Sequence, residues 1–228
     1  VRKITKTKTY KKKYNSFATV INFTHTKNHL NIAHELFYDS GPLAILPMKD
    51  SFKNLYSSSV IWTNPSNQKF SPKLLKNKKM ITKILEEKIF NFVGEIKHVY
   101  GAQQFPLSAH INHKFYDKRI LFLGDSAHSI HPIAGQGWNL GVKDIENCLK
   151  VFKKANKLGL DLGSDFTCKL YNDQVYYNAY SLYQITDKLN LIFLQDDFFT
   201  NQFRKIGFKF IKKYKGLKDS ITNFAMGY

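Results

Sequence analysis

The residues best suited to bind a polar ligand lie in one segment, 120–144. A short apolar run ends there at Gly124-Asp125, and a carboxylate at the end of a strand can accept hydrogen bonds from ligand hydroxyls. The structural alternative is that Asp125 caps the turn that follows. A loop rich in small residues comes next, and a helical pattern begins near Gly137. The order of strand, carboxylate, loop and helix predicts a pocket for a phosphorylated cofactor.

The loop and the helix start each add something to this pocket. Glycines at 135 and 137 allow a flat ligand to approach the backbone closely. The first turn of a helix offers backbone N–H groups without a partner in the helix, together with a partial positive charge. The Gly-x-Gly-x-x-Gly turn that usually accompanies such a pocket does not occur in the 228 residues.

The remaining chain must supply the elements that hold this segment. Alternating or apolar runs predict strands at 17–23, 43–46 and 59–63, with a further strand ending near 105–107. Apolar residues at helical spacing predict a helix over 72–93. Strands in succession with a helix laid on them predict a mostly antiparallel sheet from about 17 to 111. Beyond Gly163 we expect two long helices, 166–193 and 200–213.

Composition limits the function classes. The net charge of +18 favours an acidic partner, but only three of the 35 basic residues are arginine, the preferred side chain for phosphate and base recognition. We therefore expect a solvated lysine surface and no nucleic-acid partner, with an anionic membrane surface as an alternative. Cys148 and Cys168 lack metal spacing and are expected to be reduced thiols. No run is long enough to span a bilayer.

Specific residues carry a family resemblance. The run Gly124-Asp125-Ser126-Ala127-His128, followed by 131–141 and Asp144, resembles the second flavin-binding motif of FAD-dependent aromatic-ring monooxygenases with the p-hydroxybenzoate hydroxylase fold. Within that family, the run is more similar to the ubiquinone-biosynthesis hydroxylases than to the family in general. Segments 41–47, 59–63, 186–190 and 225–227 agree with that family as well.

The resemblance covers the whole chain but only the C-terminal part of the family. We therefore expect a fragment that lacks the N-terminal dinucleotide-binding motif and that alone holds FAD poorly. Ser126, Ser129 and Trp138 depart mildly from the pattern, and Trp138 puts the shape of the pocket in doubt.

The resemblance also implies roles for single residues. Asp125 would bind a ribityl hydroxyl of FAD, and Gly124 would let the pyrophosphate region lie close. The loop around Pro132 would line the isoalloxazine, and the N–H groups of Trp138 and Asn139 would bind its pyrimidine carbonyl. The full implied cofactor set is Gly124, Asp125, Pro132, Ala134, Gly135, Gln136, Gly137, Trp138 and Asn139.

The fold class implied is α+β or α/β, a partial FAD-binding domain with an antiparallel-sheet substrate domain and C-terminal helices. The function implied is hydroxylation of a polyprenylated phenol of ubiquinone biosynthesis with FAD, NAD(P)H and O2, and no protein nucleophile is needed. The alternative is a non-catalytic fragment or partner-binding subunit of a ubiquinone-biosynthesis complex. Four apolar residues are candidates for the substrate cavity, with plain core packing as the alternative for each: Leu43, Ile45, Val60 and Trp62.

We expect four parts along the chain: a connection at 1–16, the sheet domain at 17–118, the FAD-binding unit at 119–160 and a helical region at 161–228. A polyprenyl substrate implies a cytoplasmic protein peripherally bound to the inner membrane. The aromatic and basic segment 203–214 suits such contact, although a core-facing helix fits it too. His128 and His131 have no third metal ligand in sequence, so we expect structural or flavin-adjacent roles.

Overall fold

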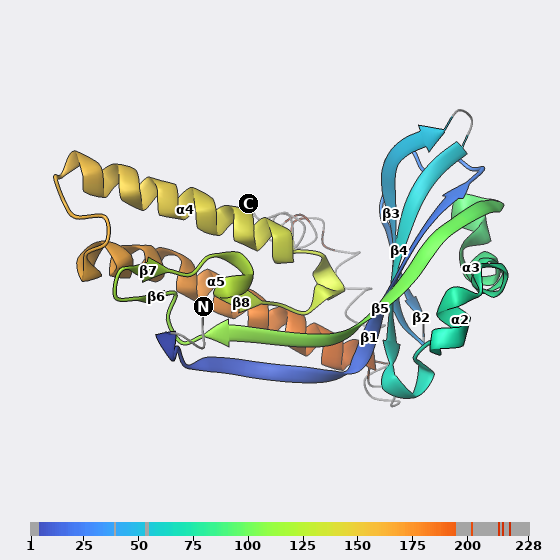
Figure 1. Cartoon of the computed structure of the whole chain (residues 1–228), viewed down its shortest axis with the longest axis horizontal. Coiled ribbons are helices and arrows are strands. Elements are labelled where there is room, and N and C mark those ends of the chain that lie inside the picture. The colour runs from blue at the N-terminus through green and yellow to red at the C-terminus, as the bar shows by residue number, and fades with distance from the viewer. Residues whose placement is uncertain are drawn as a thin grey trace. The chain divides into compact units, whose positions relative to one another are not determined.

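A computed structural model describes residues 5–38, 40–52 and 55–194, together with the isolated positions 202, 214, 216 and 219. The chain forms two compact units, one of residues 14–107 and one of residues 1–13 with 108–228. The long strands β1 (Thr9–His25) and β5 (Ile96–Asn112) contribute residues to both units (Figure 1). The four-part division expected from the sequence stays a prediction.

The main sheet has six strands in the order β2-β3-β4-β1-β5-β8, and its other strands are β2 (His34–Tyr38), β3 (Gly41–Phe52), β4 (Leu55–Pro65) and β8 (His128–Ser129). The pairs β1–β4, β2–β3, β3–β4 and β5–β8 are antiparallel. The first three lie within the antiparallel region predicted from the sequence, whereas β8 lies beyond it. Strand β3 continues through Pro47, where the prediction ended it. Its pairing with β2 stops at Ile45, so a residue without an N–H is tolerated at this position.

One face of the sheet packs against α3 (Lys78–Val93), which follows the short α2 (Pro72–Lys76). Helix α3 buries four residues at helical spacing, Ile81, Leu85, Ile89 and Val93. The predicted continuous helix over 72–93 is therefore broken in two. Asn77 lies between the two helices outside the helical conformation, and its side chain accepts a hydrogen bond from the Met80 N–H to cap α3.

The second unit contains α4 (Gly137–Lys157) and α5 (Asp165–Leu194), as predicted. Around them lie the hairpin of β6 (Tyr116–Asp117) and β7 (Ile120–Leu121) and the short 3-10 helices η2 (Gly124–Ser126) and η3 (Pro132–Ala134). The apolar run before Gly124, which the sequence pattern favours as a buried strand over 120–123, forms a strand only at Ile120 and Leu121, and Ile120 is exposed. Residues 120 and 121 pair only with β6 among the described strands, because the nearest extended backbone is the other arm of the same hairpin.

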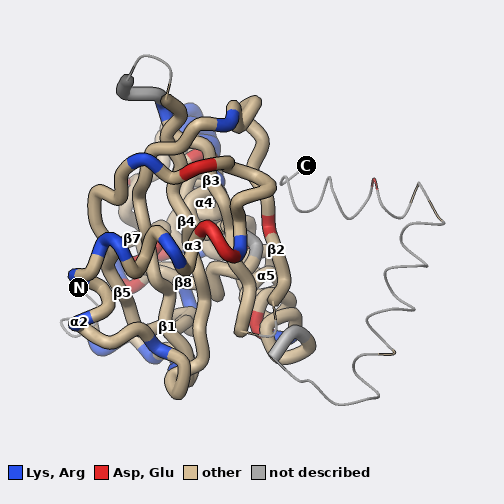
Figure 2. The backbone as a smooth tube through the Cα atoms, turned by 90° about the vertical axis from the view of Figure 1, so that its right-hand side faces the viewer, with Lys and Arg blue, Asp and Glu red and all other residues tan. Residues whose placement is uncertain are grey.

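Lysine and arginine positions, blue in Figure 2, are distributed along strands and helices alike. Within the described residues, no helix combines the length and the apolar character needed to cross a membrane. The predicted helix at 200–213, the proposed membrane segment 203–214 and the motif at 225–227 lie outside the described residues, apart from positions 202 and 214.

Candidate functional site

A cavity of about 440 Å³ lies where η2 meets the first turns of α4. The carboxylate of Asp125 is exposed at this cavity, and the side chain of Trp138 is 80% exposed. The mixture of a carboxylate, glycines and apolar side chains suits a ligand with both a flat apolar ring and hydroxyl groups. Its lining residues are Leu123, Gly124, Asp125, Gly137, Trp138, Gly141, Val142 and Ile145.

The conformation of η2 follows from two local features. Gly124 has φ +54°, in the left-handed region that favours glycine. The Ser126 side chain bridges the turn back to Leu123. Its hydroxyl donates to the Leu123 carbonyl at 2.7 Å and accepts from the Leu123 N–H at 3.0 Å. This pair of bonds explains the serine at 126, and it holds the Asp125 side chain on the outer side of the turn, where it is exposed.

A pair of glycines brings η2 close to α4. A Cβ added to Gly141 would lie 3.5 Å from the Gly124 Cα, and one added to Gly124 would lie 3.9 Å from the Gly141 Cα. Both distances are ordinary van der Waals contacts, so the turn and the helix lie close to each other at these two positions. The glycine at 124 is favoured by its positive φ.

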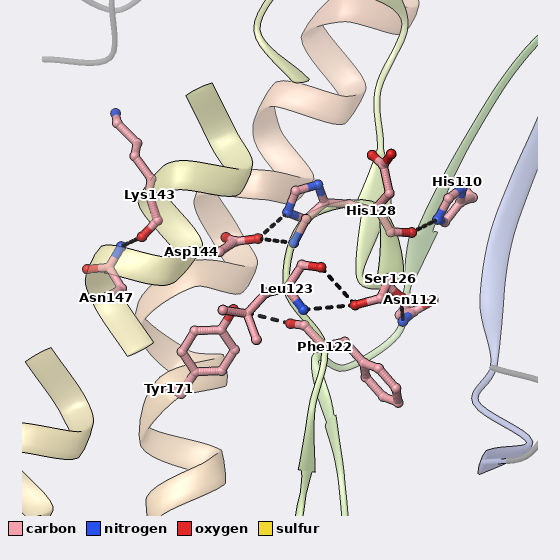
Figure 3. A network of polar contacts seen from close by, with 12 residues as sticks. His110, Asn112, Phe122, Leu123, Ser126, His128, Lys143, Asp144, Asn147 and Tyr171 are labelled. Carbon is pink, nitrogen blue, oxygen red and sulfur yellow. Dashed lines mark hydrogen bonds and ion pairs between the residues drawn. The ribbon is translucent and has the colours of Figure 1, made fainter. Parts of the chain in front are cut away.

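A buried carboxylate connects η2, α4 and β8 (Figure 3). Asp144, 1% exposed, accepts a hydrogen bond from the Gly124 N–H at 2.9 Å. The same oxygen lies 2.7 Å from Nε2 of His128, a side chain that is 2% exposed. His128 therefore has a structural partner, as the sequence led us to expect.

Residues of strand β5 and helix α5 also bond to the backbone around this turn, as Figure 3 shows. The His110 ring Nε2 lies 3.1 Å from the Asp125 carbonyl oxygen, and the Asn112 side chain donates to the Ser126 carbonyl at 2.9 Å. From α5, the Tyr171 hydroxyl donates to the Phe122 carbonyl at 3.2 Å. The backbone on both sides of Asp125 is thus fixed by buried or half-buried side chains.

The loop before α4 is shaped by η3. His131 caps it, because its Nδ1 accepts from the Ile133 N–H at 3.2 Å, and Pro132 occupies the first helical position. Burial lowers the pKa of His131 to about 4, so the ring is neutral at pH 7. Gly135 ends η3 at φ +60°, and Gln136 occupies the N-cap position of α4 without a capping bond from its side chain. The backbone therefore reaches the start of α4 through a turn that only glycine adopts easily.

The space around Gly135 and Gly137 shows whether a flat ring such as a flavin can lie against this part of the backbone. A Cβ added to Gly135 or to Gly137 would meet nothing within 4 Å. Their lack of a side chain therefore does not serve packing within the described chain, and it leaves open space above the helix N-terminus. A flat ring seated there would meet the first-turn N–H groups of α4, which have no partner within the helix. A flavin fits this combination of open backbone, N–H donors and nearby carboxylate.

Of the nine residues predicted to bind a cofactor, Gly124, Asp125, Gly137 and Trp138 line the cavity. Pro132, Ala134, Gly135 and Gln136 belong to η3 and the turn into α4, and Asn139 lies exposed in the first turn of α4. The sequence did not identify Leu123, Gly141, Val142 and Ile145 as lining residues. Their helical spacing from Trp138 was a signal for the last three.

The four predicted substrate residues lie elsewhere. Leu43, Ile45, Val60 and Trp62 are at most 3% exposed and belong to the core cluster between the sheet and α3. This is the core-packing alternative that the sequence left open for each of them. The opposite face of the same strands carries Val20, Ala44 and Ile61, which lie side by side in register and are half-buried.

No group of three or more potential ligands that could hold a metal ion occurs among the described residues. Cys148 and Cys168 are free thiols, the first half-buried and the second buried. Burial raises the pKa of both thiols.

A family model described as an FAD binding domain matches residues 2–157. Among curated proteins, this chain is 29% identical over 215 residues to the ubiquinone hydroxylase UbiL of Rhodospirillum rubrum. The aligned region covers 94% of this chain and 48% of UbiL. It is 30% identical over 120 residues to the mitochondrial ubiquinone biosynthesis monooxygenase COQ6 of Schizosaccharomyces pombe, covering 52% of this chain and 25% of that protein. The chain therefore spans about half the length of UbiL, and the match to COQ6 spans a quarter of that protein.

Solved structures share the fold. The p-nitrophenol 4-monooxygenase PnpA of Pseudomonas putida matches 98% of this chain and 55% of its own, with a TM-score of 0.70 at 14% sequence identity. CabE, an aromatic hydroxylase from angucycline biosynthesis, matches the whole chain and 44% of its own, with a TM-score of 0.67 at 16% identity. At these identities the likeness concerns the fold alone.

Proposed function

Because this chain belongs to the family of FAD binding domains, we propose that it holds the flavin and ribityl part of FAD in the cavity between η2 and α4. The observation that carries the proposal is the position of Asp125 beside the first turn of α4, with glycines on both sides of the cavity. The carboxylate accepts hydrogen bonds from ribityl hydroxyls, while the helix N-terminus donates to a ring carbonyl and favours negative charge on it.

FAD, when bound, supplies the electron transfer and oxygen activation that hydroxylation of an aromatic ring requires. The residues of this chain would bind and orient the ring. The apolar side chains of Val142 and Ile145 on α4 line one side of the cavity, and the N–H groups at residues 137–139 would donate to a ring carbonyl. No side chain is required as a nucleophile.

We propose that the substrate is a polyprenylated phenol, hydroxylated with NAD(P)H and O2, since relatives are named as ubiquinone hydroxylases and monooxygenases of ubiquinone biosynthesis. We place the substrate face of the sheet on the side opposite α3, where Val20, Ala44 and Ile61 are half-buried. A polyprenyl tail also implies contact with a membrane surface, for which we propose the segment 203–214. Lack of sedimentation with anionic vesicles at low salt would contradict that contact.

Flavin binding is tested with the chain itself, by titrating it with riboflavin, FAD and ADP while following flavin fluorescence. The proposed contacts are to the ring and the ribityl chain, so riboflavin and FAD should bind with similar affinity and ADP should not compete. Two variants locate the site. Asp125→Ala should weaken both flavins at least tenfold, and Gly137→Ala should do the same without loss of stability, because its Cβ meets no protein atom.

The outcomes separate the candidate functions. Weak binding of both flavins is expected, because the chain alone should hold FAD poorly. A complete absence of riboflavin and FAD binding would refute the flavin site and would favour the partner-binding subunit. Competition by ADP would place the principal contacts on the adenosine half instead. Hydroxylation is tested by mass spectrometry of a short-chain prenylated phenol incubated with FAD, NAD(P)H and O2. Addition of one oxygen atom that depends on Asp125 is expected, and flavin binding without it would leave a binding role only.

A further inference from the structure

Asp144 is an acidic residue buried on the inner face of α4, a position where charge is costly unless it is paired. Its Oδ2 accepts from the Gly124 N–H at 2.9 Å and lies 2.7 Å from Nε2 of His128. If this face of α4 served helix packing alone, an apolar side chain at position 144 would suffice. The carboxylate is instead bonded to the turn that carries Asp125.

The three groups joined here belong to three elements, and two of those elements form the cavity. Asp144 lies two helical turns below the start of α4, whose outer side supplies Trp138 and Val142 to the cavity. Gly124 is the residue before Asp125 and lines the cavity itself. One oxygen atom therefore ties the turn that carries Asp125 to the inner face of α4.

We propose that Asp144 is a positioning residue for flavin binding, which holds the Asp125 turn at the distance from α4 that the ribityl chain and ring require, with His128 orienting the Asp144 carboxylate. The proposal rests on the proposed function. Asp144 reaches the ligand only through Gly124, so its removal displaces Asp125 without removing any ligand contact. Supporting residues of this kind typically change ligand affinity ten- to a hundredfold when removed from metal sites.

The test compares three variants of the full chain. Asp144→Ala removes the shared acceptor, and Asp144→Asn keeps one oxygen but loses the charge, which makes hydrogen bonds roughly half as strong. Asp161→Ala is the matched control. Its carboxylate also accepts a backbone N–H, from Gly163 at 3.0 Å, and pairs with Arg119, but it lies beyond the C-terminal end of α4.

Two quantities are measured for each variant: riboflavin and FAD affinity by fluorescence, and amide hydrogen exchange at Gly124. Asp144→Ala should weaken both ligands at least about tenfold and accelerate exchange at Gly124, in the range seen for supporting residues. Asp144→Asn should fall between this variant and the wild type. Asp161→Ala should leave both quantities unchanged even where it lowers the midpoint of urea unfolding.

Wild-type affinity in a folded Asp144→Ala chain would overturn the inference and leave the flavin site standing. An equal loss in Asp161→Ala would also overturn it, because the effect would then be one of general stability. Where Asp144→Ala does not fold, Asp144→Asn decides, and wild-type affinity together with wild-type Gly124 exchange in that variant would refute positioning. If the wild-type chain binds neither riboflavin nor FAD, the proposed function itself fails. This outcome is distinct from failure of the positioning role, which is seen only when the wild type and the Asp144 variants are compared.

Discussion

Truncation of Leu43 decides whether the apolar residues of β3 and β4 serve the core or a substrate. Leu43 is fully buried, lies opposite Trp62 in the β3–β4 register and belongs to the cluster that packs on α3. Leu→Ala at such positions costs about 2–5 kcal/mol, because the lost transfer free energy is added to that of a cavity. The neighbouring strands leave little room for collapse, so we expect Leu43→Ala to lower the free energy of unfolding by about 3 kcal/mol.

The chain contains two tryptophans, and they report on different units. Trp62 is 3% exposed in the unit of residues 14–107, whereas Trp138 is 80% exposed in the other. Urea unfolding followed by fluorescence in a Trp138→Phe background therefore reports on the environment of Leu43. Leu30→Ala is the control, since that leucine is 68% exposed in the same unit and its loss should change stability by less than about 0.5 kcal/mol.

A loss below about 1 kcal/mol for Leu43→Ala would refute the core assignment, since it lies outside the range for a fully buried leucine. If such a variant also turned over a prenylated phenol more slowly, the residue would line a ligand cavity. A large loss of stability with normal turnover in the surviving folded fraction would place the substrate on the other face of the sheet. The same comparison then applies to Ile61→Ala, whose side chain is half-buried on that face.

Two further predictions concern backbone and pH. Gly41→Ala should cost about 3 kcal/mol or more, or prevent folding, because φ is +109° and the new Cβ would lie 1.9 Å from the Thr63 carbonyl oxygen; Gly101→Ala, whose Cβ meets nothing, should leave the urea midpoint nearly unchanged. His131 has a pKa of about 4 in the folded protein against about 6.5 when unfolded, so the unfolded chain takes up the proton first and stability falls as the pH is lowered from 6.5 to 4. Between pH 7 and pH 5 the wild type should lose about 2 kcal/mol more than His131→Leu in urea titrations, and equal losses would contradict a neutral buried ring.

The sequence predicted element types well because hydrophobic periodicity depends on neighbours along the chain. The antiparallel sheet and α5 follow directly from such patterns. The predicted ends of strands were less accurate. Strand β3 continues through Pro47, where its pairing with β2 has already ended. The strand expected over 120–123 is shorter than predicted for a related reason, because residues 120 and 121 pair with the β6 arm of their own hairpin.

The two faces of α4 show why the ligand site was only partly predictable. Val142, Ile145 and Leu149 follow the helical period, yet all three are about half exposed, and Val142 and Ile145 form the cavity wall. The buried face instead contains Leu140 and the charged Asp144. Periodicity identifies a stripe, but it does not say whether the protein or a ligand covers that stripe.

The supporting residues were hidden for a different reason. The bonds from Asp144 to Gly124 and His128 form where the η2 turn lies against α4, with Gly124 and Gly141 facing each other. This contact joins residues 20 positions apart, as the Gly124–Asp144 bond shows. The sequence shows only that a glycine, a histidine and an aspartate lie in the same segment of the chain. Only the folded backbone shows that one carboxylate oxygen ties them together, beside the turn that carries Asp125.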